Sequence, residues 1–190
     1  MIAKIRNNPR LRIYLRDRIE DEGIEVGIDG NLSQNEYVGV KVDDYYNGLH
    51  QPTVPKSVDY VVVVDNSCDS YNLYILEMKN VNSPQKLVIK DIHEKFANTI
   101  ADFLSEEFKE IFLADRYKYK DIKLYLVSDA YGIGGKYQTH KDYVRYLDKI
   151  NKKDSLRVDR NLSSKIFKFR KRYLRIEYDI PPNPVIKKSY

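Results

Sequence analysis

The sequence predicts a single mixed α/β domain in which a helix, three strands, a long helix and a further strand follow one another. Two apolar segments at 58–65 and 71–79 flank the polar residues "NSCDS", which is typical of a β-hairpin. Between residues 87 and 112 the apolar residues recur with a helical period instead. A further apolar strand at 121–129 then returns the chain to the predicted sheet.

The composition is that of one globular domain. The chain has 190 residues, 42% of them apolar and 32% charged, which is enough to bury a core. The single cysteine, Cys68, excludes an internal disulfide framework and a multi-cysteine zinc site. No apolar run approaches the roughly 20 residues of a membrane span, and no secretory signal is present. We therefore expect a cytoplasmic prokaryotic protein with no membrane partner, and the net charge of +5 suits a polyanionic partner.

The N-terminal third of the chain predicts one helix and one strand. The stretch "NPRLRIYLRDRIEDEG" begins with a capping pair and ends at Gly23, which predicts a first helix over 9–22. Residues at helical spacing support it: Leu11, Leu15, Ile19 and Glu22. A short strand at 36–42 follows, and the turn-rich segment 43–56 with two prolines predicts a connector.

The remaining elements alternate in the same way. The long helix of residues 87–112 has one apolar face, formed by Ile89, Ile92, Phe96, Ile100, Phe103 and Ile111. After the strand at 121–129, a loop at 131–136 and a helix at 139–150 capped by Thr139 are expected. Between Arg157 and Arg175 there are eight Lys or Arg residues and one acid. Helical spacing there predicts a basic amphipathic helix through Leu162, Ile166, Phe169, Tyr173 and Ile176.

Three charged residues interrupt the apolar hairpin: Asp59, Glu77 and Lys79. If Asp65 pairs with Tyr71, counting outward along both strands sets Asp59 opposite Glu77, with Lys79 leaning from the same face. Two carboxylates at that separation must share a cation, or one of them must stay protonated. Mg²⁺ takes one or two carboxylates plus substrate phosphate, and a neighbouring lysine can orient or deprotonate an attacking water. The pattern predicts phosphodiester hydrolysis.

The alternative interpretation is structural. Asp59 would begin a strand, and Glu77 and Lys79 would form a solvated ion pair at a frayed strand end. An acid-x-Lys sequence occurs three times, at Glu77–Lys79, Glu107–Lys109 and Asp121–Lys123. Only the first follows an apolar strand that begins with an acid and precedes a long helix.

Asp59 followed by Glu77-Met78-Lys79 resembles the signature of the PD-(D/E)XK nuclease superfamily. The resemblance covers residues 9–128 and implies a restriction-endonuclease-like core of order α-β-β-β-α-β, a mixed central sheet flanked by helices. It implies that Asp59, Glu77 and the backbone carbonyl of Met78 bind Mg²⁺, with Mn²⁺ as a substitute, and that Lys79 assists the water. The chain departs from the family pattern at Val58, where the family has proline.

Some members of the superfamily carry another acid that holds a second metal. Here Glu22, in phase with the apolar stripe of the expected first helix, or Glu36, at the start of the expected first strand, would serve. A plain surface glutamate is the alternative at both positions.

The resemblance extends to type II restriction endonucleases, which implies a sequence-specific nuclease that cuts duplex DNA as a homodimer. We expect the region 129–190 to contact DNA beside the catalytic core. The candidate DNA-binding residues are Lys90, His93, Lys95, Lys136, Gln138, Lys141, Lys165, Lys168, Arg170 and Arg172. A solvated helix face is the alternative for the first three, and a mobile surface turn for the next three. A structure-selective nuclease of the junction resolvase or repair type, or a non-catalytic DNA-binding module, are alternative functions.

Overall fold

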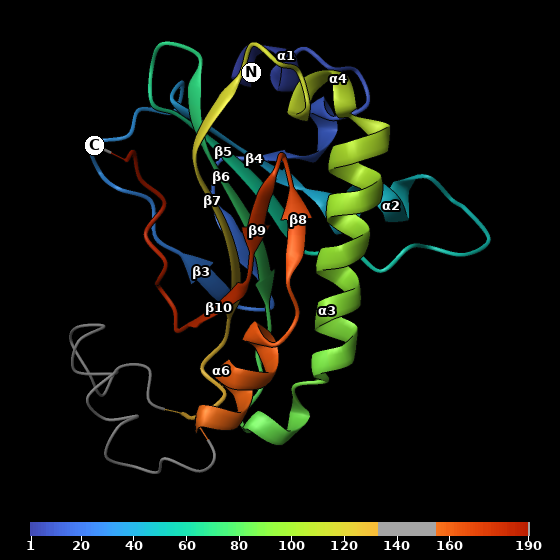
Figure 1. Ribbon diagram of the computed structural model, residues 1–190, viewed down its shortest axis with the longest axis vertical. Coiled ribbons are helices and arrows are strands. Elements are labelled where there is room, and N and C mark those ends of the chain that lie inside the picture. Colours follow the sequence, from blue (N-terminus) through green and yellow to red (C-terminus); the bar gives the residue numbers. More distant parts are fainter. Residues whose placement is uncertain (133–154, 190) are drawn as a thin grey trace.

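The computed structural model describes residues 1–132 and 155–189 (Figure 1). A six-stranded mixed sheet forms the centre of the molecule, in the order β1-β4-β5-β6-β7-β10. β5 is antiparallel to both of its neighbours, β4 and β6, whereas β7 is parallel to β6 and β10 is parallel to β7. The strands of this sheet are β1 (Leu15–Arg16), β4 (Tyr37–Lys41), β5 (Tyr60–Asp65), β6 (Ser70–Met78), β7 (Lys118–Val127) and β10 (Ile176–Asp179). The mixed α/β class is therefore confirmed.

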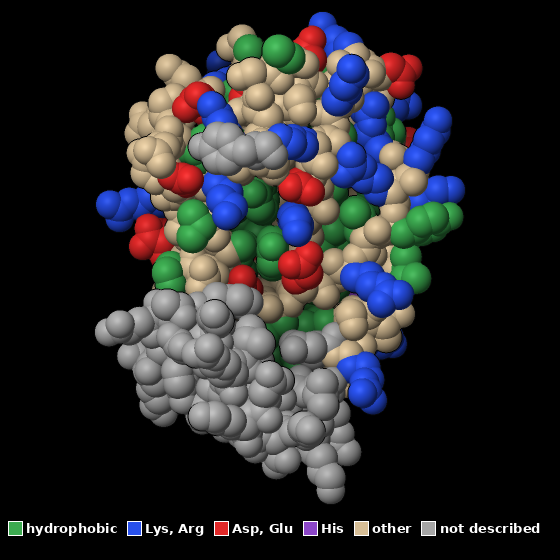
Figure 2. Space-filling view, turned by 60° about the vertical axis from the view of Figure 1, so that its left-hand side comes forward, with side chains coloured by type: hydrophobic (Ala, Val, Ile, Leu, Met, Phe, Trp, Pro, Cys, Tyr) green, Lys and Arg blue, Asp and Glu red, His purple; other side chains and the backbone are tan. Residues whose placement is uncertain are grey.

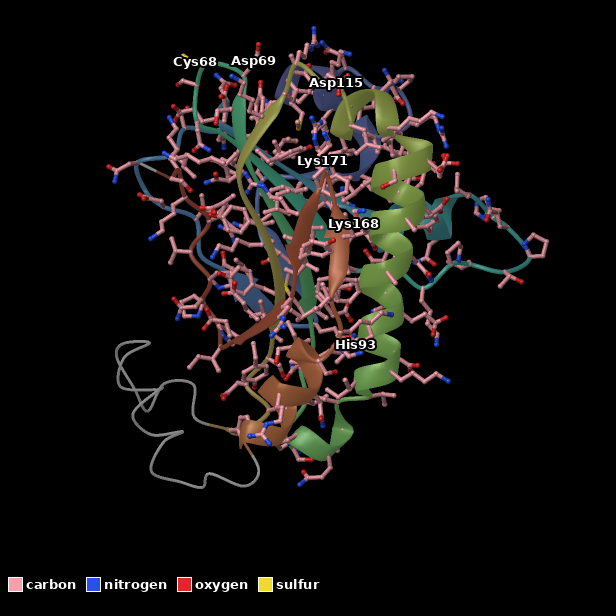
Figure 3. All side chains as sticks on the ribbon, viewed as in Figure 1. Cys68, Asp69, His93, Asp115, Lys168 and Lys171 are labelled. Atoms are coloured by element: carbon pink, nitrogen blue, oxygen red, sulfur yellow. The ribbon has the colours of Figure 1, made fainter. Side chains whose placement is uncertain are left out.

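The central hairpin has the register that the sequence predicts. Asp65 pairs with Tyr71 and Tyr60 pairs with Leu76, so Asp59 and Glu77 are the next opposed residues outward. Residues 61–64 are all valine, and their side chains alternate between the two apolar faces of the sheet. The turn lies at the far end of the hairpin from Asp59, where Figure 3 labels Cys68 and Asp69. It is tight, because both residues have a positive φ.

Helices cover one face of the sheet (Figure 1). The long helix that the sequence predicts is present in three consecutive parts: α3 (Ile89–Asn98), the π-helical η3 (Thr99–Glu107) and α4 (Lys109–Phe112). Its buried residues Phe96 and Phe103 belong to the same apolar cluster as Leu73 and Ile75 of β6. The shorter helices are α1 (Ile2–Arg6), η1 (Arg12–Tyr14), α2 (Val42–Gly48) and η2 (Pro84–Lys86). In the described part of the chain, no helix combines the length and hydropathy needed to cross a bilayer.

A small hairpin and the C-terminal segment cover the other face. β2 (Ile19–Asp21) pairs with β3 (Ile24–Val26), and both belong to the second apolar cluster with Val62 and Ile186. The predicted helix over 9–22 is therefore wrong. Around Glu22 and Gly23 the apolar residues alternate with glutamates, which is the period of a strand, and both turn residues have positive φ.

The connector predicted at 43–56 contains a helix. α2 occupies its first part, because Tyr45 and Tyr46 are both buried in the main core, where Tyr45 packs edge-on against Phe103. The two prolines of the segment lie beyond the end of α2. The remainder of the segment is irregular, as predicted.

The C-terminal basic helix predicted through 162–176 is also wrong. The chain forms α6 (Ser155–Ser163), then β8 (Phe167–Phe169), β9 (Arg172–Leu174) and β10. Phe167, Phe169 and Leu174 are buried and alternate with exposed basic residues, so a strand and not a helix buries them on one face. Most of the predicted loop at 131–136 and all of the predicted helix at 139–150 lie outside the described residues.

A polar cavity of about 630 Å³ lies between the β7–β10 part of the sheet and the C-terminal segment 183–189. Its lining includes Tyr74, Tyr125 and Lys123. On the face drawn in Figure 2, hydrophobic side chains lie in a hollow bordered by Lys, Arg, Asp and Glu side chains. None of the residues that line the cavity belongs to the acidic end of the central hairpin.

Candidate active site

The three charged residues of the central hairpin meet at one end of the sheet. Asp59 precedes β5 directly and is 3% exposed, and Glu77, near the end of β6, is fully buried. The Met78 amide N–H donates a hydrogen bond of 2.6 Å to Asp59 Oδ2, which holds this carboxylate against β6. Lys79 Nζ lies 3.3 Å from Glu77 Oε1. The predicted grouping of two carboxylates and one ammonium is therefore present, whereas the predicted role of the Met78 carbonyl stays a prediction.

A second ammonium group reaches Glu77 from the covering helix. Lys95 of α3 donates a hydrogen bond of 2.6 Å to Glu77 Oε1, so two lysines share this oxygen. The sequence predicts Lys95 as a DNA contact, but in the structure its side chain points into the carboxylate site. Lys95 directly precedes the buried Phe96, and this position places it at the edge of the helix face that packs on the sheet.

Burial and mutual repulsion disfavour ionisation of the two carboxylates. Burial, together with the neighbouring Glu77 charge, raises the pKa of Asp59 to about 8. Burial also raises the pKa of Glu77, although Lys95 and Lys79 oppose this shift. Glu77 Oε2 is buried and accepts no hydrogen bond within the described part of the chain. Divalent cations such as Mg²⁺ prefer hard oxygen donors. The carboxylates of Asp59 and Glu77 are buried donors of this kind, and Glu77 Oε2 is unpaired among the described residues.

Glu22 borders the same site, from the turn of the β2–β3 hairpin. Its Oε1 lies 3.2 Å from Lys79 Nζ, and its Oε2 accepts a hydrogen bond from the Asn80 amide. Burial would lower the pKa of Lys79, but the carboxylates of Glu77, Asp59 and Glu22 raise it overall, so Lys79 is an ammonium at neutral pH. Of the two acids proposed for a second metal, Glu22 is the one that the structure brings to the site.

Glu36 lies at the opposite end of the sheet. Its backbone carbonyl accepts a hydrogen bond from Asp65, at the far end of β5 from Asp59. Its carboxylate pairs with Lys188, and this hydrogen bond, together with those from Ser33, lowers its pKa to about 2. Glu36 therefore does not join the candidate site.

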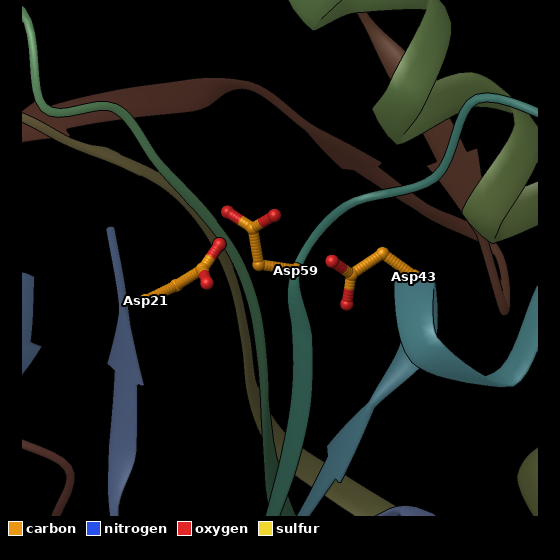
Figure 4. A group of neighbouring side chains, drawn as sticks. All are labelled: Asp21, Asp43 and Asp59. Atoms are coloured by element: carbon orange, nitrogen blue, oxygen red, sulfur yellow. The ribbon is translucent and has the colours of Figure 1, made fainter. Parts of the chain in front are cut away.

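Three aspartates form a further carboxylate group around Asp59 (Figure 4). One oxygen each from Asp21 at the end of β2, Asp43 in the first turn of α2, and Asp59 lie within 4.8 Å of one another. The buried Lys41 Nζ lies 3.1 Å from Asp21 and 3.2 Å from Asp43. The group has the composition of a metal site, but this ammonium already supplies one positive charge to it.

The sequence pointed to neither Asp21 nor Asp43 as a site residue. Asp21 falls inside the expected first helix and Asp43 inside the expected connector. Their approach to Asp59 depends on how β2 and α2 pack at the same end of the sheet. One signal for Asp21 was available, because it lies two residues before Gly23 in a segment where apolar and acidic residues alternate. The same signal applies to Glu22.

Three of the predicted DNA contacts, His93, Arg170 and Arg172, have polar contacts within the fold. His93 Nε2 lies 3.0 Å from the Leu162 carbonyl oxygen, so the ring is directed at α6 (Figure 3). Arg170 donates hydrogen bonds to the carbonyls of Phe112 and Ala114, and Arg172 donates to those of Tyr119 and Lys120. These three side chains therefore connect segments that are far apart in the sequence.

Other predicted contacts remain on the surface. Lys90 and Lys168 are exposed, and Lys165 Nζ lies 5.3 Å from the centre of the Phe167 ring. Lys136, Gln138 and Lys141 lie outside the described residues.

Comparisons with known protein families, curated proteins and solved structures found no match to this chain.

Proposed function

We propose that the protein is a Mg²⁺-dependent endonuclease that hydrolyses phosphodiester bonds of duplex DNA at Asp59, Glu77 and Lys79. One observation carries the proposal. Asp59 directly precedes β5, where the hairpin register sets it opposite Glu77 of β6, and both residues are buried. Glu77 Oε2 is unpartnered within the described residues, while Lys79 Nζ lies 3.3 Å from Glu77 Oε1. An ordinary structural ion pair does not need a second buried acid beside it, because that acid raises the cost of burying charge.

Asp59 and Glu77 would hold the metal, with Glu22 beside them and Asp21 and Asp43 on the other side of Asp59. Mg²⁺ fits this oxygen donor set, and Mn²⁺ accepts the same ligands. When bound, such an ion supplies positive charge to the scissile phosphate and makes nearby water more acidic. The partly exposed side chains of Lys79 and Glu22 form the rim of the site, and the two buried acids lie beneath it.

The two lysines have separate roles in this proposal. Hydrolysis forms a bond between a water oxygen and phosphorus and breaks one P–O ester bond, leaving a phosphate monoester and a hydroxyl group. Lys79, on the rim, orients the water and offsets the charge that develops on phosphorus. Lys95 holds Glu77 Oε1 at 2.6 Å and fixes the direction of its carboxylate.

The topology supports the more specific assignment to the PD-(D/E)XK superfamily. The antiparallel strands β4, β5 and β6, then α3, then β7 parallel to β6, follow the order that the resemblance implies. α1 takes the place of the helix expected at 9–22. Within the superfamily we propose a sequence-specific restriction enzyme that acts as a homodimer, because cutting both strands of a palindrome calls for two-fold symmetry.

Cleavage of phage DNA with Mg²⁺, followed by sequencing of the fragment ends, tests the proposal. Lys79→Ala is expected to slow cleavage by about 10²-fold or more. Lys109→Ala is a matched control, because it removes an exposed lysine from another acid-x-Lys sequence. Discrete fragments from the wild-type protein and this control support a restriction enzyme, whereas unchanged cleavage by Lys79→Ala overturns the catalytic assignment.

Two other outcomes would support the alternative functions. Cleavage confined to branched DNA would indicate a junction resolvase or repair nuclease. Binding without cleavage, with either Mg²⁺ or Mn²⁺, would indicate a non-catalytic DNA-binding module.

A further inference from the structure

The β8–β9 hairpin presents one apolar and one basic face. Phe167 pairs with Leu174, and both are buried in the main core together with Phe169. Lys168 pairs with Tyr173, and because side chains alternate along a strand these two point away from the core. The hairpin is therefore fixed by its inner face, and its outer face is available to a partner.

The cations of this segment divide into two groups. Between Lys165 and Arg175 the sequence has six Lys or Arg residues and no acid. Arg170 and Arg172 bond to backbone carbonyls of the body of the protein. Lys168, Lys171 and Arg175 are exposed and form no ion pair or hydrogen bond through their side chains with any described residue. Figure 3 labels Lys168 on β8 and Lys171 at the hairpin turn.

Two exposed apolar side chains lie among Lys168, Lys171 and Arg175. Tyr173 is 75% exposed and Ile166 is 52% exposed, although isoleucine is usually buried and tyrosine is usually half-buried. By the register, Ile166 lies opposite Arg175 and Tyr173 lies opposite Lys168. Cations and apolar groups thus alternate across a two-stranded ribbon, and a ribbon of this kind fits the major groove of B-DNA.

We propose that the outer face of the β8–β9 hairpin docks on duplex DNA. Lys168, Lys171 and Arg175 contact phosphates, while Tyr173 and Ile166 contact base edges or sugars in the groove. The choice of a duplex rests on the proposed function. The hairpin packs on the same face of the sheet as α3, the helix from which Lys95 reaches Glu77.

DNA binding without a divalent metal tests this proposal. A fluorescent duplex of mixed sequence is titrated with wild-type protein and with the variant Lys168→Gln, Lys171→Gln, Arg175→Gln at a series of salt concentrations. The loss of three phosphate contacts is expected to make the slope of log affinity against log salt shallower by about 2.7. The fold-loss of affinity between about 50 and 200 mM salt is then about 40 times smaller for the variant than for the wild-type protein. Lys168→Gln alone is expected to reduce the slope by about 1.

The matched control removes three exposed cations elsewhere: Lys4→Gln, Arg12→Gln and Lys187→Gln. This control has the same net charge as the hairpin variant and is expected to keep nearly the wild-type slope. Equal slopes for the hairpin variant and the control would overturn the proposal. The proposal would also be overturned if the protein bound polyglutamate and the hairpin substitutions weakened this binding as much as they weaken binding to the duplex. That result would indicate an acidic protein partner.

Failure of this inference and failure of the proposed function are distinguishable. Hairpin-dependent binding without cleavage in Mg²⁺ or Mn²⁺ would support the docking surface and refute the nuclease. If the wild-type protein cleaves DNA and the hairpin substitutions change neither cleavage nor binding, the nuclease is supported and the docking surface is refuted.

Discussion

Replacing Asp59 with asparagine is expected to stabilise the metal-free protein at neutral pH, although it removes a proposed metal ligand. Asp59 is 3% exposed and faces the buried Glu77 across the hairpin. Burial and the Glu77 charge raise its pKa to about 8 from an ordinary value of 3.8. The folded state therefore binds a proton that the unfolded state releases between these two values, and the stability of the wild-type protein falls as pH rises from about 4 to about 8.

The size of the stabilisation follows from the interval between the ordinary pKa of Asp59 and its pKa in the folded protein. Each pH unit between the two pKa values corresponds to about 1.4 kcal/mol, so the penalty at pH 7 has an upper limit of about 4 kcal/mol. Asparagine keeps an oxygen that can accept the Met78 N–H and carries no charge against Glu77. We expect Asp59→Asn to raise the free energy of unfolding at pH 7 by about 2–4 kcal/mol.

Urea denaturation with EDTA at several pH values between 4 and 8 measures this effect. Asp115→Asn is the control, because Asp115 is exposed and its removal leaves the buried pair intact. The variant Asp59→Asn is expected to show a flatter stability profile than the wild-type protein and the control. A loss of stability at pH 7, or a profile parallel to that of the wild-type protein, would show that ionisation of Asp59 does not destabilise the fold.

Two further predictions concern residues around the site. Lys95→Met leaves Glu77 with Lys79 as its remaining ammonium contact, so we expect a loss of about 1–3 kcal/mol at pH 8. Because burial raises the pKa of Glu77, its carboxylate gains a proton more readily as pH falls, and we expect a smaller loss at pH 5; chemical denaturation at both pH values checks this, and equal losses would contradict it. Gly39→Ala would bring a Cβ to 2.4 Å from Ile19 Cδ1, with an expected loss of about 1–3 kcal/mol. Gly30→Ala is its control, because no atom lies within 4 Å of that Cβ, and thermal unfolding that ranks the two variants equally would refute the packing of β2 on the sheet.

The central hairpin and the long helix could be predicted because local patterns determine both. Residues 61–64 can form little other than a buried strand, and the polar turn sets the register that brings Asp59 opposite Glu77. The helical period over 87–112 is long enough to be unambiguous. Local sequence thus predicted the elements that carry the catalytic candidates.

Short strands with irregular turns could not be predicted in the same way. The β8–β9 turn places Arg170 and Lys171 at positive φ, where glycine or asparagine is the usual signal. Without that signal, apolar residues that alternate in two short strands were equally compatible with helical spacing. The segment 9–22 failed for a similar reason, because three apolar residues at helical spacing outweighed the alternation around Gly23.

The residues that complete the site depend on tertiary packing. Lys95 reaches Glu77 because α3 packs on the sheet at one particular rotation, and Asp21 and Asp43 meet at Asp59 through two elements that the sequence did not predict. Lys41 is a β-strand lysine whose burial between two aspartates has no local pattern. Sequence alone could therefore identify the acidic pair but not the charges that surround it.

Binding of Mn²⁺, followed by electron paramagnetic resonance, tests whether Asp59 and Glu77 form a metal site. We expect that the wild-type protein and Asp115→Asn take up Mn²⁺, that Mg²⁺ competes for it, and that the double variant Asp59→Asn, Glu77→Gln loses it. Uptake of Mn²⁺ by the double variant at wild-type affinity would show that these two acids do not hold the metal.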